Sequence, residues 1–263
     1  MNIYIILSIL LLIIITIIKY NNKKEGLETK LNLCFYTYFY GSDNNISYKI
    51  PPIPSSKYKC YYYTNNKILL EKLKNTKWIG VYDSVNTTDD MIDSAMKSKR
   101  VKALPQLYSN LNTYDYTVMY DSKYMLINEL VIEELIETYC INNNYALLIR
   151  KHPFINDVFG EFNESLKQER YLIQKEKMLN YINKQLNNGL KEKTGNHSAT
   201  GFIIRNMKHP EINNINNTWY THILDCGIEC QISFFFVTQL YIDYIYTFDN
   251  NVCFNNITTF LCD

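Results

Sequence analysis

The chain has 263 residues, with 27 lysines and arginines against 26 aspartates and glutamates, so its charges nearly cancel. This balance excludes the basic surface that nucleic-acid binding needs, and it leaves no acidic tail. About 240 residues remain after an apolar start, which is enough for one large domain with a substantial core. The 24 tyrosines against only 8 glycines are typical of coding by an AT-rich genome.

The chain begins with an almost unbroken apolar run from Ile3 to Ile18. Such a run is long enough to cross a bilayer as a helix, and no small-residue cleavage pattern follows it. We therefore predict a single-pass membrane anchor over residues 1–20 and a polar stalk over 21–30. Lysines follow the run and none precedes it, which favours a cytosolic body, whereas six Asn-x-Ser/Thr sequons favour a lumen. An endomembrane and a viral-factory membrane both fit, and the orientation stays open.

Residues 31–263 are predicted to form one domain in which strands alternate with helices. Apolar or aromatic runs predict strands at 31–38, 58–64, 78–82, 116–121, 145–149 and 201–205. Capping residues and helical spacing predict helices from 90 towards 100, over 128–139, over about 165–186 and over 231–246. Prolines keep the loop from 41 to 56 out of helices and central strands. The alternation is typical of a mixed α/β domain around one mainly parallel sheet.

Common catalytic and metal-binding fingerprints are absent from the sequence. It contains no glycine-rich P-loop, no dinucleotide fingerprint, no Gly-x-Ser-x-Gly elbow and no His-Glu-x-x-His motif. The cysteines are scattered, and Cys226 and Cys230 stand four apart without partner histidines. A disulfide among the last four cysteines, which include Cys253 and Cys262, and a set of reduced buried thiols both agree with this pattern.

The stretch from Tyr114 to Lys123 carries the strongest chemical signal. Its strand-like run ends on Asp121. A carboxylate at the carboxyl end of a buried strand lies where open α/β sheets bind their ligands. Such a carboxylate can hold a hard divalent cation, which in turn can hold a diphosphate. Taken alone, the stretch is more simply a strand followed by an Asp-Ser turn.

Several short segments, taken in order, resemble one known family. The segments are Tyr36-Thr37 with Gly41, Thr64-Asn65, Arg100 to Pro105, Tyr114 to Asp121, His152-Pro153 with Glu161, Gly201 to Arg205, Trp219, and Gln231 to Phe234. Over roughly Leu33 to Tyr241 the chain resembles the TOD1/MUCI70-type glycosyltransferase-like family, formerly a domain of unknown function. The resemblance implies a GT-A-like fold that moves a sugar from a nucleotide-sugar donor to an unknown glycan, protein or lipid acceptor.

The resemblance also implies roles for individual residues around the donor. Asp121 would hold a Mn²⁺ or Mg²⁺ ion that bridges the two phosphates and neutralises the leaving charge. Arg100 and Lys102 would contact the phosphates directly. Tyr36 and Thr37 would lie near the base and the ribose.

The same resemblance makes His152, Glu161 and Gln231 candidates for the acceptor and leaving-group side. The chain departs from the family where Lys123 replaces an asparagine after the central Asp, and where Cys230 replaces an aspartate before Gln231. These departures keep open an alternative, a catalytically inactive binding or scaffold protein at a membrane. A lipid hydrolase ranks third, because the sequence offers no nucleophile with its base.

Overall fold

The computed structural model describes residues 31–86, 90–126, 129–249 and 258–260. The predicted anchor and stalk, 1–20 and 21–30, lie outside them. Within the described residues, helices of the length and apolarity needed to cross a bilayer are not found. The chain divides into two units, Met1–Asn32 and Leu33–Asp263, and the second unit holds the elements described below. The membrane anchor therefore stays a prediction from the sequence.

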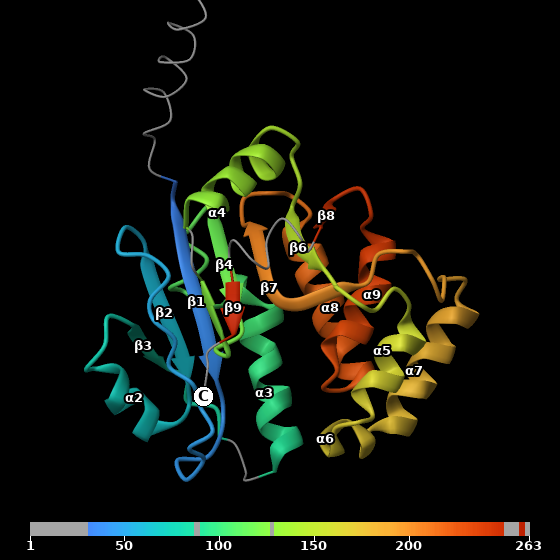
Figure 1. Cartoon of the computed structure of the whole chain (residues 1–263), viewed down its shortest axis with the longest axis horizontal. Coiled ribbons are helices and arrows are strands. Elements are labelled where there is room, and N and C mark those ends of the chain that lie inside the picture. Colours follow the sequence, from blue (N-terminus) through green and yellow to red (C-terminus); the bar gives the residue numbers. More distant parts are fainter. Residues whose placement is uncertain (1–30, 87–89, 127–128, 250–257, 261–263) are drawn as a thin grey trace, which may run out of the picture. The chain divides into compact units, whose positions relative to one another are not determined.

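A seven-stranded sheet forms the centre of the second unit, in the order β3-β2-β1-β4-β7-β6-β8 (Figure 1). The strands are β1 (Leu33–Phe39), β2 (Lys59–Thr64), β3 (Ile79–Tyr82), β4 (Tyr116–Tyr120), β6 (Leu147–Lys151), β7 (Ser198–Asn206) and β8 (Ile245–Phe248). Strand β7 runs antiparallel to both of its neighbours, β4 and β6, while the other pairings are parallel. The prediction of a mixed α/β domain with a mainly parallel sheet is confirmed. A separate antiparallel pair joins β5 (Tyr124–Leu126) to β9 (Thr258–Phe260).

Ten helical segments are present in the described part of the chain. They are α2 (Lys67–Leu73), α3 (Met91–Ala103), η1 (Pro105–Leu107), α4 (Glu129–Leu135), η2 (Ile136–Ile141, a π-helix), α5 (Val158–Ser165), α6 (Glu169–Leu172), α7 (Lys175–Asn187), α8 (Ile212–Cys226) and α9 (Cys230–Leu240). Helix α3 begins as predicted, because the Asp90 side chain accepts hydrogen bonds from the backbone N–H groups of Ile92 and Asp93.

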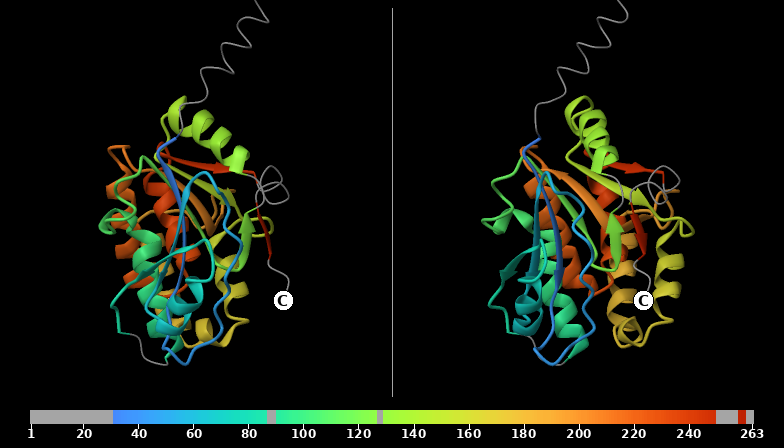
Figure 2. Two further views of the ribbon diagram at one scale, coloured as in Figure 1. Left: turned by 90° about the vertical axis from the view of Figure 1, so that its left-hand side faces the viewer. Right: turned by 60° about the vertical axis from the view of Figure 1, so that its left-hand side comes forward.

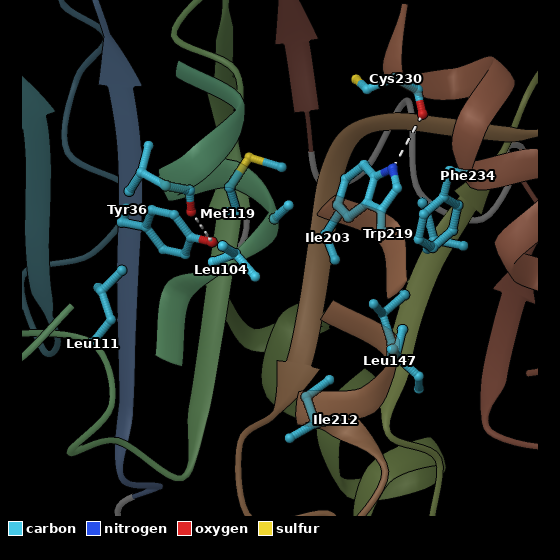
Figure 3. Packing of buried hydrophobic residues seen from close by; sticks show 14 of the residues in the cluster. Tyr36, Leu104, Leu111, Met119, Leu147, Ile203, Ile212, Trp219, Cys230 and Phe234 are labelled. Atoms are coloured by element: carbon cyan, nitrogen blue, oxygen red, sulfur yellow. Dashed lines mark hydrogen bonds between the residues drawn. The ribbon is translucent and has the colours of Figure 1, made fainter. Parts of the chain in front are cut away.

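Helices α3, α8 and α9 share the main hydrophobic core with one face of the sheet. Figure 3 shows Trp219 of α8 between Ile203 of β7 and Phe234 of α9, with its ring centroid 4.7 Å from that of Phe234. The Trp219 indole also donates to the Cys230 carbonyl over 3.3 Å. Helices α3 and α8 contact each other and lie side by side in both further views (Figure 2). This packing fixes where the carboxyl end of α3 meets the sheet.

A second apolar cluster joins α5 and α7 to the far side of α9. Its buried side chains include Val158, Phe162, Met178, Ile182 and Phe236. Helix α9 therefore buries apolar side chains on two sides, since it packs against the sheet on one side and against these helices on the other. This double burial places the first turn of α9 rigidly at the carboxyl edge of the sheet.

Two predicted helices end differently in the structure. The helix expected over about 165–186 is wrong as a single element, because extended backbone at Gln168 and a turn after Leu172 divide it, and Ile173 is 68% exposed instead of facing inward. The helix expected over 231–246 ends at Leu240. Residues 245–248 instead add to the sheet as β8, since an evenly apolar run has no helical period and pairs with the open edge of β6.

The cysteines in the described residues decide part of the choice between a disulfide and reduced buried thiols. Cys34, Cys60, Cys140, Cys226 and Cys230 are all free and buried. Cys226 and Cys230 therefore do not pair with each other, while Cys253 and Cys262 lie outside the described residues.

Candidate functional site

A cavity of about 570 Å³ opens beyond the carboxyl ends of β1 and β4. One wall comes from the end of β1 and the loop after it, and a second from the segment after β4. Helices α3 and α6, the first turn of α9 and the start of β7 complete it. The lining includes Tyr38, Phe39, Tyr40, Ser94, Ser98, Lys99, Lys102, Asp121, Lys123, Tyr124, Arg170, Tyr171, Thr200, Gly201, Glu229 and Gln231. Open α/β sheets bind ligands at this edge.

Asp121 and Lys102 form an ion pair in the wall of the cavity. The Lys102 ammonium lies 3.4 Å from Asp121 Oδ1, and the lysine side chain is only 3% exposed. Tyr38 donates its hydroxyl to the same oxygen over 3.1 Å. Burial alone would raise the pKa of Asp121, but the charges of Lys102 and Lys123 outweigh it and lower the pKa to about 2. Burial opposes the charge on Lys102 as well, yet Asp121 keeps the lysine pKa above its usual value. Both groups are therefore charged at neutral pH.

Arg205 fixes the position of Lys102. This fully buried arginine donates to the Lys102 carbonyl over 2.7 Å and to Asn216 Oδ1 over 2.9 Å. It also donates to the Tyr36 hydroxyl over 3.2 Å. The last turn of α3 is thus tied to β1, β7 and α8 at once, so the Lys102 side chain leaves the helix towards Asp121.

Gly201 makes room for Asp121 on the neighbouring strand. A Cβ at this position would lie 2.6 Å from the Tyr124 ring and 3.2 Å from Asp121 Oδ2. The Gly201 carbonyl accepts a hydrogen bond from the Asp121 backbone N–H over 2.9 Å. A side chain at residue 201 would therefore displace the tyrosine that forms part of the cavity wall.

Cations outnumber carboxylates around the cavity. Lys99, Lys102, Lys123 and Arg170 line it, against Asp121 and Glu229. The Nε of Arg170 is buried and has no hydrogen-bond partner among the described residues, while its guanidinium lies 4.6 Å from the ring centre of Tyr171. Side chains of this kind bind phosphate oxygens through charge-assisted hydrogen bonds.

Glu229, at the start of α9, has a different environment from Asp121. Its carboxylate caps α9 by accepting from the Gln231 backbone N–H over 2.9 Å. Burial, and then the charge of Glu161, raises its pKa above the usual value. A carboxyl group with a raised pKa keeps its proton to a higher pH than a free glutamate does, and raised carboxyl pKa values of this kind are typical of general acid–base catalysis.

Gln231 connects the cavity to a buried chain of polar groups. Its Nε2 donates to Glu161 Oε1 over 2.7 Å, and its Oε1 accepts from the Thr200 backbone N–H over 3.2 Å. The other oxygen of Glu161 lies 3.1 Å from Nε2 of the fully buried His197. His152 lies next to His197, and its Nδ1 accepts from the backbone N–H groups that follow Pro153.

The residues predicted from the sequence therefore divide into two groups. Asp121, Lys102 and Gln231 share the cavity lining. Glu161 lies one layer behind, through Gln231. Tyr36 and Thr37 are fully buried within β1, Arg100 is exposed at the end of α3, and His152 shapes the turn after β6; these four are not among the lining residues of the cavity. Any catalytic or binding role for them stays a prediction.

Other lining residues had no distinctive signal in the sequence. Tyr38, Lys99, Arg170 and Glu229 reach the cavity from four separate elements or loops. Tyr38 was detectable in principle, because it follows Tyr36 on the same face of a strand that ends at the predicted ligand edge. Arg170 and Glu229 come from helix ends whose positions depend on the packing of α6 and α9.

The residues around Asp121 do not fit a divalent cation held in the way the family resemblance implies. A Mn²⁺ or Mg²⁺ ion would need oxygen ligands at about 2.1 Å. The Oδ1 of Asp121 already accepts from Tyr38 and Lys102, and a second cation would meet the buried ammonium. Among the described residues, clusters of three or more His, Cys, Asp or Glu side chains suited to a metal are not found.

Glycosyltransferases are among the solved structures that this chain is similar to. Mouse xyloside xylosyltransferase 1, apo form, has a TM-score of 0.48 and 8% identity, over 83% of this chain and 85% of that one. The bifunctional glycosyltransferase WbbM, apo, has a TM-score of 0.46 and 15% identity, over 84% of this chain and 39% of that one. Core-mannan synthase A of Aspergillus fumigatus, in its Mn/GDP form, has a TM-score of 0.48 and 10% identity, over 89% and 76%.

No protein-family model matches the chain, and no curated protein matches its sequence. Identities this low, with TM-scores below 0.5, do not identify the particular family that the sequence resembles. The function of this chain is therefore argued from its own residues.

Proposed function

We propose that this protein transfers a sugar from a nucleoside-diphosphate donor to an acceptor hydroxyl in the cavity beyond β1 and β4. The observation that carries the proposal is the cation-rich lining at this edge, with the pair of buried Lys102 and half-buried Asp121 at its centre. A diphosphate is the ligand part that such a lining suits. Tyr38, Phe39 and Tyr40 offer aromatic surface for the base.

The transfer requires one bond to form and one to break at the same sugar carbon. The acceptor oxygen forms a bond to the anomeric carbon, and the bond from that carbon to the diphosphate oxygen breaks. The nucleoside diphosphate leaves with the electron pair, and the cationic side chains stabilise its charge. The proton of the acceptor hydroxyl passes to a carboxylate, a role for which the raised pKa of Glu229 is suited.

The family resemblance implies a Mn²⁺ or Mg²⁺ ion in this step, and the surroundings of Asp121 argue against one.

Membrane anchoring through residues 1–20 belongs to the proposal as well. It is tested by alkaline extraction of membranes, which should leave the full chain in the pellet and release a chain that lacks residues 1–20.

The proposed activity is tested by thermal unfolding of the full-length protein with a panel of nucleotide sugars, in buffer with and without manganese chloride. Binding to the folded state raises the melting temperature by mass action. The expected result is a rise in melting temperature with at least one donor. An activity assay with that donor should then detect release of its nucleoside diphosphate. Binding without any release, with every acceptor tried, would instead favour the inactive binding protein. A cooperative transition that no donor shifts would sink the proposal.

A further inference from the structure

The Lys102–Asp121 pair is built as a permanent part of the fold. Lys102 is 3% exposed, and Arg205 holds its backbone carbonyl over 2.7 Å. Removing the charge of Asp121 leaves the buried ammonium without its partner, which is strongly unfavourable. The ammonium therefore does not leave Asp121 to make space for a metal ion.

The Lys102 ammonium has N–H groups that Asp121 does not use. A lysine carries three N–H groups, and Asp121 occupies one of them over 3.4 Å. Lys102 also belongs to the cavity lining. No second acceptor for the ammonium is found in the described part of the chain, so its remaining donors are available to an anion at the edge of β4, in the place where a metal-dependent enzyme would hold its cation.

The charges around the cavity match those of a sugar-bound diphosphate. The four lining cations Lys99, Lys102, Lys123 and Arg170, less the two carboxylates Asp121 and Glu229, leave a net charge of +2. A diphosphate bonded to a sugar and a nucleoside carries about two negative charges at neutral pH. Four basic side chains can therefore neutralise the donor without a divalent ion.

We propose that Lys102, held by Asp121, takes the place of the divalent cation, so that this cavity binds the diphosphate of its nucleotide-sugar donor without metal. This inference rests on the proposed function, because it concerns the same donor site. Asp121 is then a positioning residue for the lysine, where the family resemblance makes it a metal ligand.

Calorimetric titration of the full-length protein distinguishes the two roles. UDP, GDP, CDP, ADP and dTDP are titrated in buffer that contains EDTA, and again in buffer that contains manganese chloride. The expected result is that at least one nucleotide binds with dissociation constants that agree within about threefold in the two buffers. Binding that appears only with manganese overturns metal-free recognition and leaves the proposed transfer intact. Failure to bind in both buffers overturns both.

Variants of Lys102 sharpen the test. In EDTA, Lys102→Ala should weaken binding of the nucleotide by about tenfold or more, because a charge-assisted contact is lost. The same substitution frees Asp121, so manganese should restore part of the affinity. Lys102→Arg should keep metal-free binding. An alanine variant that binds as tightly as the wild type in EDTA would contradict the proposal.

The matched control is Lys97→Ala on the same helix. Lys97 pairs with Asp93 at the surface over 3.5 Å and is not part of the cavity lining. Its removal should leave the dissociation constant within about twofold of the wild type in both buffers. If Lys102→Ala does not fold, Lys102→Met keeps the aliphatic length and tests the same loss of binding.

Discussion

Two carboxylates face one cavity, and their surroundings drive their protonation in opposite directions. Asp121 has the buried Lys102 beside it and a pKa lowered to about 2. Glu229 has Glu161 as its strongest charged neighbour, and burial together with this like charge raises its pKa. The first is suited to hold charge permanently, and the second to exchange a proton. The difference agrees with the proposed function, in which the β4 side of the cavity binds the donor and Glu229 on the α9 side accepts the proton.

The strongest way to break this comparison is Asp121→Asn. The substitution leaves the Lys102 ammonium buried without a counter-charge, so the free energy of unfolding at pH 7 should fall by about 3 kcal/mol. Urea unfolding measures the change. Asp93→Asn on α3, the helix that carries Lys102, is the control, because its surface pair with Lys97 should contribute about 0.5 kcal/mol or less. Equal effects of the two substitutions would contradict the special role of the buried pair.

The same pair predicts how stability depends on acid. The folded-state pKa of Asp121 lies below its ordinary value of 3.8, so the stability it contributes is fully present above about pH 4. That contribution is lost as the pH falls from about 4 through about 2. Stability curves of wild type and Asp121→Asn should therefore converge in this window. Parallel curves down to pH 2 would contradict the lowered pKa.

Glu229→Gln tests the reactive side of the cavity. Loss of a general base should slow release of nucleoside diphosphate by about a hundredfold, while the dissociation constant for the nucleotide changes by less than about threefold. Equal losses in binding and rate would move Glu229 from catalysis to donor binding. Discontinuous assays, in which the released nucleotide is measured at set times, give the rate.

The stability that Glu229 contributes depends on pH in the opposite direction from the stability that Asp121 contributes. The folded-state pKa of Glu229 lies above its ordinary value of 4.5, so the stability it contributes below pH 4.5 is lost as the pH rises through the folded pKa. Glutamine keeps the cap on α9 and does not ionise. Glu229→Gln should therefore gain stability relative to wild type between pH 4 and pH 8, as thermal unfolding at both values would show. A gain that is independent of pH would reject this explanation.

Gly201→Ala should have an intermediate effect on the binding side. A methyl group there must push the Tyr124 ring away from a 2.6 Å approach, which should cost about 2 kcal/mol of stability. Weaker nucleotide binding should accompany the loss, because Tyr124 belongs to the cavity wall. Gly189→Ala is not a suitable control, since Gly189 has a positive φ of 89°. Ala199→Gly, two residues away on β7, removes one methyl group and leaves Tyr124 in place.

The smallest expected effect is that of Gln231→Leu. It breaks the 2.7 Å hydrogen bond to Glu161 and should cost about 1 kcal/mol in stability. Glu161 keeps its contact with His197 when the amide is removed. The rate of donor cleavage should therefore fall only modestly if Gln231 positions its neighbours and does not transfer a proton. Unfolding and rate measurements on one preparation separate the two roles.

The sequence by itself predicted the mixed α/β domain, most strands of the sheet and the importance of the segment that ends on Asp121. These features depend on local properties, namely apolar runs that suit buried strands and a carboxylate at the end of one of them. It also singled out Lys102 and Gln231, through order in the chain and resemblance to a family. The prediction of one helix over 231–246 was wrong at its end, because an apolar run alone does not show whether its last residues continue the helix or pair with a strand.

Tertiary structure alone decided which charges meet. Lys102 reaches Asp121 because Arg205, 103 residues further along the chain, holds the end of α3 against the sheet. Glu229 enters the cavity because α9 is packed between the sheet and the second helical cluster, and Arg170 enters it from α6, whose Tyr171 belongs to that cluster. Protonation states and the fit to a metal ion depend on such distances, and distances between elements far apart in the chain are set by packing, which no local pattern encodes.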